Sequence, residues 1–518
     1  MLLTGGVKPL RCTLSNHYGK AAVRASLLHF LSGKALNAVV SLLTLVALAR
    51  WLAPTDYGVY IALLALQASL LAVSSLGIDT TTERFMPELR MRHADSALLG
   101  FVLGAVGARF ASLLLLALIA WLLAQPITEL VGLATHQSAF ELWIVVVVLT
   151  GVLSIAVVLL EAMLHQRQAQ RCMSIYVVAK LLTLGLAQHY WTPNITNLVW
   201  IEVAATGLAS VTGIWFLFQR FSNTGLRSGW QIVLANRDRM QRFAFFNYVA
   251  QIVFQLFNAE VMKLLVTRML GVLQSARYGF AYSLADTVQR YLPAVLLLRL
   301  IKPVFVSRYT KTGDFAQLNA MARIILKLNL LMLVPMISFA AVYGGDLLSL
   351  LSKGKYADAH WLFVSVLGLL VLTSHQLVLS LLASTLEKNS MQLYAGLAST
   401  VAFPCALLLV PEFGPLGAVA ASAVGGIVYN TFATVYLRRS GVDYRPDLRG
   451  VSVFLLGGVL LYSLSLFINS LLTGAAALTA VLLVGSISYF STVRMFSAFS
   501  NEEREMLNSI LPKRIFVF

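Results

Sequence analysis

Three cationic side chains lie deep inside apolar runs of this sequence. Arg109 lies in the run 97–123, Lys180 in the run 172–189 and Arg290 in the run 278–301. An ionisable side chain in the middle of a bilayer is costly and usually faces a cavity rather than lipid. In such a cavity a cation suits a phosphate or an acidic sugar, and arginine can hold either one with two parallel hydrogen bonds. We therefore predict that these three residues bind an anionic substrate.

Carboxylates accompany some of these cations. Asp286 precedes Arg290 by four residues, so the two share a helix face and can form an ion pair. Glu260 precedes Lys263 by three residues, near one end of the run 243–270. Arg290 therefore either binds substrate or merely pairs with Asp286. The titratable carboxylates in or beside the apolar runs are Asp79, Glu202, Glu260 and Asp286. We take Asp286 and Glu260 as the candidates for coupling transport to an ion gradient.

Uncharged polar residues recur along two of the apolar runs. They are Gly33, Asn37, Ser41 and Thr44 in the run 27–52, and Asn247, Gln251, Gln255 and Asn258 in the run 243–270. Steps of three or four residues place each set on one helix face. Amides both donate and accept hydrogen bonds, which suits sugar hydroxyls, although such stripes also join helices to one another. We predict that Asn37, Gln251, Gln255 and Asn258 contribute to substrate binding.

The sequence shows no pattern typical of an enzyme. The three cysteines and eight histidines have no metal-ligand spacing. No glycine-rich phosphate loop is present, which argues against direct ATP hydrolysis. We therefore predict no catalytic residues, no metal and no cofactor.

The elements that must position these residues are membrane-spanning helices. Of 518 residues 58% are hydrophobic and only 12% are charged, with a mean hydropathy of +0.79. About 14 runs reach the ~20 residues that span a bilayer, and they lack the alternation of a membrane barrel. They are 27–52, 57–78, 97–123, 142–164, 172–189, 198–218, 243–270, 278–301, 321–343, 360–382, 393–410, 416–436, 451–472 and 475–496. The predicted fold is an all-α polytopic membrane protein.

The basic residues are distributed asymmetrically between the loops. With the N-terminus in the cytoplasm, the outer segments hold only Arg50, Lys263, Arg268, Arg277, Lys353 and Lys355, out of 39 lysines and arginines. This bias predicts an even number of spans with both termini cytoplasmic. It also accounts for the net charge of +17 without nucleic acid.

A motif occurs twice along the chain. Ala49-Arg50-Trp51-Leu52 followed by Tyr57-Gly58 returns about 220 residues later as Thr267-Arg268-Met269-Leu270 followed by Tyr278-Gly279. A duplicated membrane protein usually places its substrate site between the two repeats. We predict two pseudo-symmetric six-helix lobes around a central cavity, residues 1–235 and 236–440. Residues 441–518 then form two additional helices and a cytoplasmic tail.

The first block, residues 49–60, together with Leu76-Gly77-Ile78 and Arg84-Phe85-Met86-Pro87-Glu88, resembles a known family. It is similar to the polysaccharide-flippase (Wzx-type) branch of the multidrug/oligosaccharidyl-lipid/polysaccharide exporter superfamily, which is MATE-like. In the second half the matching residues are Thr267 to Gly271, Tyr278-Gly279 and Lys302-Pro303. The Ala-Glu-Gly-rich signature of the peptidoglycan-precursor flippases is missing after the second run.

The resemblance implies a function. A lipid-linked (polyprenyl-diphosphate) oligosaccharide would cross from the inner to the outer leaflet of the bacterial cytoplasmic membrane by alternating access. The implied partners are this substrate and membrane lipids, with a polysaccharide polymerase and a chain-length regulator acting nearby. Relatives carry a cationic cavity, and we assign that role to Arg109, Lys180 and Arg290 by position and chemistry only.

Three other functions remain open at this point. An ion-coupled small-molecule exporter of the multidrug type would favour acidic over basic cavity residues. A membrane polysaccharide polymerase or ligase would need a charged outer loop, whereas the outer loops here are short. A structural scaffold would have little use for buried charges and repeated polar stripes.

Overall fold

The computed structural model is helical, as the sequence predicts. It describes residues 20–92, 95–163, 165–219, 226–255, 258–293, 295, 315–386, 388–442 and 444–510. Within these ranges there is no strand, and eleven helices are long and apolar enough to cross a membrane. The chain is therefore a multi-pass membrane protein, and eleven described spans are compatible with the predicted 14. The end of the run 278–301 lies outside the described residues, as do Lys302 and Pro303.

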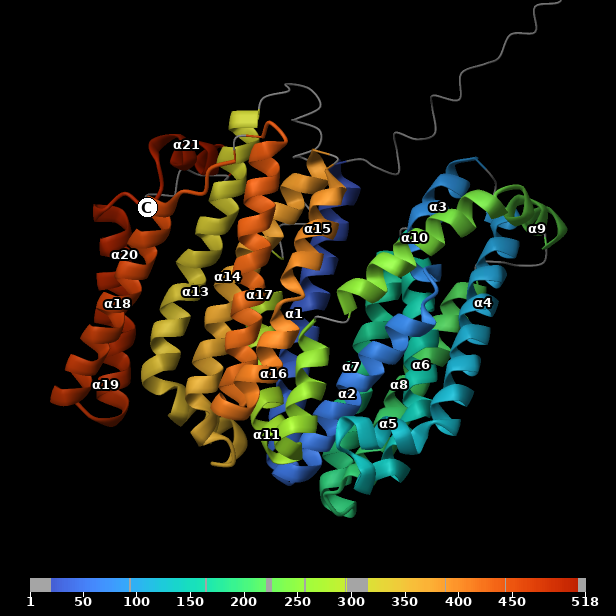
Figure 1. The fold of residues 1–518 in the computed structure, drawn as a ribbon, viewed down its shortest axis with the longest axis horizontal. Coiled ribbons are helices and arrows are strands. Elements are labelled where there is room, and N and C mark those ends of the chain that lie inside the picture. Colours follow the sequence, from blue (N-terminus) through green and yellow to red (C-terminus); the bar gives the residue numbers. More distant parts are fainter. Residues whose placement is uncertain are drawn as a thin grey trace, which may run out of the picture.

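The helices form two groups joined near the middle of the molecule (Figure 1). The first group comprises α2 (Pro54–Ser74), α3 (Ile78–Arg92), α4 (Asp95–Leu122), α5 (Ala124–Val131), α6 (Gln137–Ala162), α7 (Gln166–Tyr190) and α8 (Ile195–Phe218). The second comprises α13 (Phe315–Ser352), α14 (His360–Thr385), α15 (Asn389–Ser399), α16 (Ala402–Phe413), α17 (Pro415–Arg439) and α18 (Leu448–Leu471). Helix α1 (Lys20–Trp51) packs on α7 and also contacts α13.

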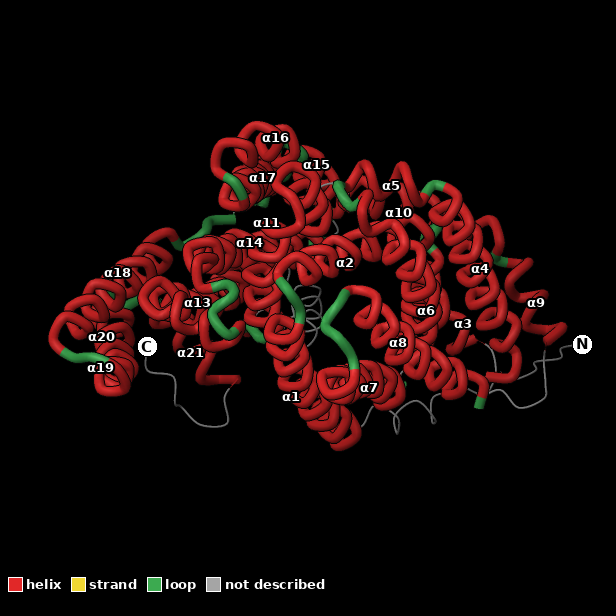
Figure 2. The backbone as a smooth tube through the Cα atoms, turned by 90° about the horizontal axis from the view of Figure 1, so that it is seen from below, coloured by secondary structure: helices red, strands yellow, loops and turns green. Residues whose placement is uncertain are grey.

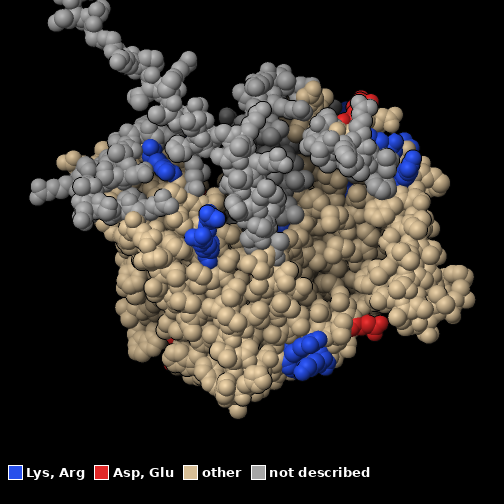
Figure 3. Space-filling model, turned by 180° about the vertical axis from the view of Figure 1, so that it is seen from behind, with Lys and Arg blue, Asp and Glu red and all other residues tan. Residues whose placement is uncertain are grey.

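Three further helices connect the groups, and three short ones close the chain. The connecting helices are α9 (Leu226–Ala235), α10 (Arg237–Gln255) and α11 (Ala259–Arg290). The chain ends with α19 (Gly474–Ala480), α20 (Ser486–Met495) and α21 (Asn501–Ile510). Figure 2, a view along the helices, shows α2 and α11 at the centre. The face in Figure 3 is mostly uncharged, with most charged side chains toward its two ends, as a lipid-facing surface requires.

The predicted run 243–270 is not one continuous helix. Helix α10 ends at Gln255, and the Asn258 side chain accepts hydrogen bonds from the backbone N–H groups of Glu260 (2.9 Å) and Val261 (3.3 Å). These bonds make Asn258 the N-cap of α11. The prediction that Asn258 continues the helix face of Asn247, Gln251 and Gln255 is therefore wrong.

The next predicted boundary is confirmed, whereas another predicted span is divided. Helix α11 covers residues 259–290 in two segments that meet in a kink at Gly271, where φ is +82° and ψ is 172°, so the chain breaks between the predicted runs 243–270 and 278–301. Glycine tolerates this backbone conformation because it has no Cβ. The predicted run 393–410 is divided between α15 and α16.

Helices α2 and α11 approach each other closely at the two copies of the Tyr-Gly motif. A Cβ atom on Gly58 would lie 1.8 Å from the carbonyl oxygen of Val272. A Cβ atom on Gly279 would lie 2.4 Å from Cγ1 of Ile61. The repeated glycines therefore have a packing role, since each one lets a helix of one half touch the other half.

We expect Gly58→Ala to lower the unfolding temperature of the purified protein in detergent. The new methyl group meets backbone rather than a flexible side chain, so the helices must separate, at a cost of about 1–3 kcal/mol. Gly107→Ala is the matched control, because a Cβ there meets nothing within 4 Å. Equal unfolding temperatures for the two variants would contradict the close approach.

A buried lysine attaches the C-terminal helices to the second group. Nζ of Lys327, in α13, lies 2.5 Å from Oδ2 of Asp447 and 2.6 Å from Oε2 of Glu503. Asp447 also accepts a hydrogen bond from the backbone N–H of Gly450 at the start of α18, and Glu503 lies in α21. Burial alone would raise the pKa of Asp447, but Lys327, this backbone bond and Arg323 hold that pKa below its usual value. One ammonium group thus joins α13, α18 and α21.

Lys327→Met should destabilise this attachment strongly. It leaves two carboxylates without their cation, and breaking a buried ion pair from one side costs about 3 kcal/mol or more. We expect a lower unfolding temperature and faster proteolysis after residue 440. Arg449→Met, at an exposed position of α18, should change stability by no more than about 0.5 kcal/mol. Similar behaviour of both variants would argue against the attachment.

Candidate functional site

Two cations at one end of the molecule join α1, which packs on α7 of the first group, to α13 of the second group. The Arg50 guanidinium at the end of α1 donates to the carbonyl oxygens of Leu350 (2.6 Å) and Leu351 (3.1 Å) near the end of α13. Nζ of Lys355, just after α13, donates to the carbonyl oxygens of Arg50 (2.8 Å), Leu52 (2.7 Å) and Ala49 (3.3 Å). Each cation thus satisfies the free C-terminal carbonyls of the other helix. We call Arg50 and Lys355 the reciprocal latch.

Aromatic rings pack beside the latch. Ring centroids of Tyr57 and Phe280 lie 6.1 Å apart, those of Tyr57 and Tyr356 5.7 Å, and those of Phe280 and Tyr356 4.7 Å. All three rings are buried. Burial, together with the charge of Lys353, lowers the pKa of Lys355. The rings and the latch close the space between the two groups at this end.

Other basic residues predicted on the outer side lie at the same end. Nη2 of Arg277 lies 2.5 Å from Oδ2 of Asp358, and Arg268 donates to the carbonyl oxygen of Glu129 (3.1 Å). Figure 1 shows α3, α9 and α21 at the opposite end of the molecule. The latch, the aromatic rings and these outer basic residues therefore gather at one end, which we call the closed end.

Lys355→Met should open the closed end. The substitution removes three charge-assisted hydrogen bonds, so we expect at least about a tenfold shift toward open conformations. Leu52→Cys in a cysteine-free background reports this change, because Leu52 is fully buried in the closed form. An impermeant thiol reagent should label it faster in Lys355→Met. Lys353→Met is the matched control, since no hydrogen bond of the Lys353 side chain is found among the described residues. Equal labelling in both would disprove the latch.

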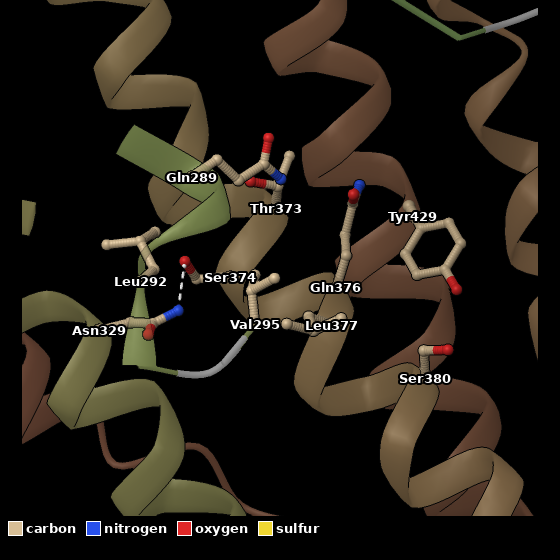
Figure 4. A pocket seen from close by; sticks show the side chains of 10 residues that line it. All are labelled: Gln289, Leu292, Val295, Asn329, Thr373, Ser374, Gln376, Leu377, Ser380 and Tyr429. Atoms are coloured by element: carbon tan, nitrogen blue, oxygen red, sulfur yellow. Dashed lines mark hydrogen bonds between the residues drawn. The ribbon is translucent and has the colours of Figure 1, made fainter. Parts of the chain in front are cut away.

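A polar cavity of about 390 Å³ lies within the second group (Figure 4). Its walls come mainly from α11, α13, α14 and α17, and no charged side chain lines it among the described residues. They are Gln289, Leu292, Val295, Asn329, Thr373, Ser374, Gln376, Leu377, Ser380 and Tyr429. This volume falls within the usual range for small-molecule sites, and amides and hydroxyls can make directional hydrogen bonds.

An apolar cavity of about 480 Å³ is lined by α11 at the turns that precede the polar cavity. Leu284, Thr287 and Val288 of α11 line it, whereas Gln289 and Leu292 line the polar cavity. The other walls come from α1, α13, α14, α18 and the segment around α20. Helix α11 therefore borders a polar space and an apolar space within one and a half turns.

Arg109 is buried against the end of α2. Its guanidinium donates to Ser74 Oγ and to the carbonyl oxygen of Leu71, both at 3.2 Å, and Asp79 lies 3.8 Å away. The side chain is 2% exposed. In this conformation Arg109 joins α4 to α2, so its predicted role in substrate binding requires a change of partners.

Lys180 is buried in a compact polar cluster of the first group. It forms an ion pair with Glu202 and donates to the hydroxyl of Tyr60 (2.7 Å). Glu202 also accepts hydrogen bonds from Tyr60 (2.9 Å) and Tyr176 (3.1 Å). The cluster joins α2, α7 and α8, and its polar groups satisfy one another.

Arg290 is the most accessible of the three predicted cations. It donates to Oδ2 of Asp286 through Nε (3.0 Å) and Nη2 (2.6 Å), as the spacing of four residues predicts. The two side chains are 69% and 40% exposed. Glu260 pairs with Lys263 at 2.8 Å. The ion pair predicted from spacing is confirmed for Asp286 and Arg290.

The predicted amides have separate partners. Asn37 accepts a hydrogen bond from Ser174 (2.8 Å), and Gln251 accepts one from Ser75 (3.0 Å). Asn258 donates to the side chain of Gln255 (2.8 Å). The structure does not bring these residues to the polar cavity, and their role in substrate binding stays a prediction.

Sequence reasoning missed the residues that line the polar cavity. Gln289 is adjacent to Arg290, which was singled out for its charge alone. Thr373, Gln376 and Ser380 repeat at three and four residues in the run 360–382. That spacing is the same signal that identified the two predicted stripes.

Comparison with known proteins places the chain among polysaccharide-synthesis proteins. Residues 47–361 match the family described as polysaccharide biosynthesis protein.

The chain belongs to this family.

Solved structures show the same fold. The chain is similar to a structure titled "Lipid II flippase MurJ, inward closed conformation", with a TM-score of 0.70, 11% identity and coverage of 92% of this chain and 99% of that one. It is also similar to an inward-facing multidrug resistance MATE family transporter of the MOP superfamily (TM-score 0.63, 12% identity, 80% and 99% covered). The MATE multidrug transporter DinF-BH in complex with R6G gives a TM-score of 0.55 at 15% identity (85% and 99% covered). No curated protein matches the chain. The family match confirms the predicted kinship with polysaccharide-synthesis proteins, and the solved structures confirm the predicted fold.

Proposed function

We propose that this protein is a flippase for lipid-linked oligosaccharide repeat units in surface polysaccharide biosynthesis. The observation that carries the proposal is the pair of cavities on α11, one polar and one apolar. A lipid-linked oligosaccharide has a glycan that needs hydrogen bonds and a chain that needs apolar surface. The family to which the chain belongs supports a role in polysaccharide assembly.

The proposed mechanism is alternating access between two lobes, residues 1–235 and 236–440, with 441–518 carried on the second lobe. The lysine and arginine bias places the termini in the cytoplasm and the reciprocal latch on the outer side of a bacterial cytoplasmic membrane. In this orientation the closed end faces outward, which suits pick-up of substrate from the inner leaflet. Opening of the latch would then release substrate outward.

Arg290 is the proposed ligand of the diphosphate. It is exposed and follows Gln289 of the polar cavity directly, and a diphosphate can replace Asp286 as its partner. Arg109 and Lys180 would bind the diphosphate only after they separate from their present partners. Asp286 would then be free to bind a cation, so it and Glu260 remain our candidates for ion coupling.

An ion-coupled small-molecule exporter is the second candidate function. The similarity to MATE transporters favours it. The uncharged lining of the polar cavity argues against it, because a cationic drug would find no carboxylate there.

Deletion of the gene distinguishes the two functions. For a flippase we expect loss of surface polysaccharide, with complete repeat units accumulating on lipid carrier at the cytoplasmic face. Mass spectrometry of lipid extracts measures the accumulated repeat units. Their protection from impermeant periodate shows that they lie at the cytoplasmic face. Normal polysaccharide with altered sensitivity to toxic cations would favour the exporter. Single unpolymerised units exposed outside would favour a polymerase.

Complementation tests the proposed ligand. Arg290→Ala should fail to restore polysaccharide although the protein reaches the membrane at normal amounts. Arg449→Ala, an exposed arginine of α18, should restore it. Full restoration by Arg290→Ala would remove this residue from the substrate site.

A further inference from the structure

We propose that the polar cavity is a subsite for uncharged sugar residues and that it excludes the diphosphate of the substrate. The inference rests on the proposed flippase function and adds the residues that recognise the glycan. These are Gln289 of α11, Gln376 of α14 and Tyr429 of α17.

The three recognition residues have polar groups that are available to a ligand in the part of the chain that the structure describes. Among the described residues no hydrogen-bond partner is found for the side-chain amides of Gln289 and Gln376 or for the hydroxyl of Tyr429, and all three side chains are half-buried. Together they offer four amide N–H donors, two carbonyl acceptors and one hydroxyl, by the chemistry of these side chains. A sugar presents adjacent hydroxyls that both donate and accept. The cavity therefore matches a sugar in the kind of its polar groups.

The rest of the polar wall is already fixed in place. Asn329 donates to Ser374 (3.0 Å), and Ser374 donates to the carbonyl oxygen of Leu370 (2.7 Å). Gln392 donates to the hydroxyl (3.0 Å) and the carbonyl oxygen (3.1 Å) of Ser380. These bonds hold the wall in position, so less ordering is needed when a ligand binds.

Two features of α17 shape the cavity around Gln376. In Figure 4 the ring of Tyr429 and the amide of Gln376 lie on the same side of the cavity, with Gln289 and Thr373 across from them. The ring of Tyr429 supplies an apolar face for the C–H groups of a sugar, and its hydroxyl can form a hydrogen bond with a sugar hydroxyl. Gly426 keeps space open, since a Cβ there would lie 3.6 Å from Nε2 of Gln376 and 3.3 Å from Cδ1 of Leu372.

The described part of the lining carries no charge, and this determines what the cavity excludes. A diphosphate entering it would lose water without gaining a cation, which is costly. Arg290, the next residue after Gln289, does not line the cavity. The substrate would therefore be divided, with sugar in the polar cavity and diphosphate outside it at Arg290.

Binding to two ligands tests this division. The protein is reconstituted in lipid nanodiscs, and its affinity is measured for lipid-linked oligosaccharide extracted from the deletion strain and for polyprenyl diphosphate without sugar. We expect the double variant Gln289→Leu/Gln376→Leu to lose roughly tenfold or more in affinity for the first ligand, because two or more hydrogen bonds are lost. Its affinity for the second ligand should not change. Tyr429→Phe keeps the ring and should lose less than Tyr429→Leu.

Gln67→Leu is the matched control. It makes the same change at a half-buried amide of the first group, where Gln67 donates to Thr150 (3.3 Å). It should bind both ligands as the wild type does, and unfolding temperatures verify that each variant is folded. Unchanged binding in the double variant, or an equal loss for both ligands, would overturn the sugar subsite while leaving the flippase intact. A wild-type protein that does not bind the extracted lipid-linked oligosaccharide would overturn the proposed function itself.

Discussion

The close approach of α2 and α11 is the contact on which the rest of the arrangement depends. Gly58 lies against the backbone of α11, and Gly279 lies against Ile61 of α2. Because the two glycines add no side chain of their own at this contact, Tyr57 and Phe280 meet across it and Tyr356 packs on both. The latch residues at the ends of α1 and α13 are then near enough to reach each other's carbonyls. The repeated motif thus marks the place where the two halves of the chain touch.

Much of the fold could be predicted from the sequence, because a bilayer leaves few options. Long apolar runs must be helices, and the distribution of basic residues limits their order. The helix start at Asn258 was missed, since hydropathy does not detect a capping asparagine inside a polar stripe. The gap between the runs 243–270 and 278–301 did predict a break, which the structure has at Gly271. The missed N-cap is a local choice of backbone that costs little in hydropathy.

The site was harder to predict than the fold. The position of Arg109 or Lys180 inside an apolar run shows that the charge needs a polar or acidic partner. It does not show which residue that partner is. The structure supplies Ser74 and Asp79 for the first and Glu202 with Tyr60 for the second. The sequence does not single out Gln289, Gln376 and Tyr429 in this way. An uncharged polar residue in a membrane helix costs little free energy, so such residues are common. The cavity depends on three helices meeting, and a single sequence does not reveal which faces meet.

The latch also differs from an ordinary salt bridge in how its energy depends on distance and surroundings. Arg50 and Lys355 bind carbonyl oxygens at helix ends, where the attraction decays within about one turn. Once the helix ends separate by a few ångströms, little force remains to pull them back, so intermediate openings gain almost nothing. Among the described residues no carboxylate takes part, so acidification has no latch partner to protonate. Closure at this end is thus nearly all-or-none and indifferent to acidity, and it must be controlled by what occupies the space between the two halves.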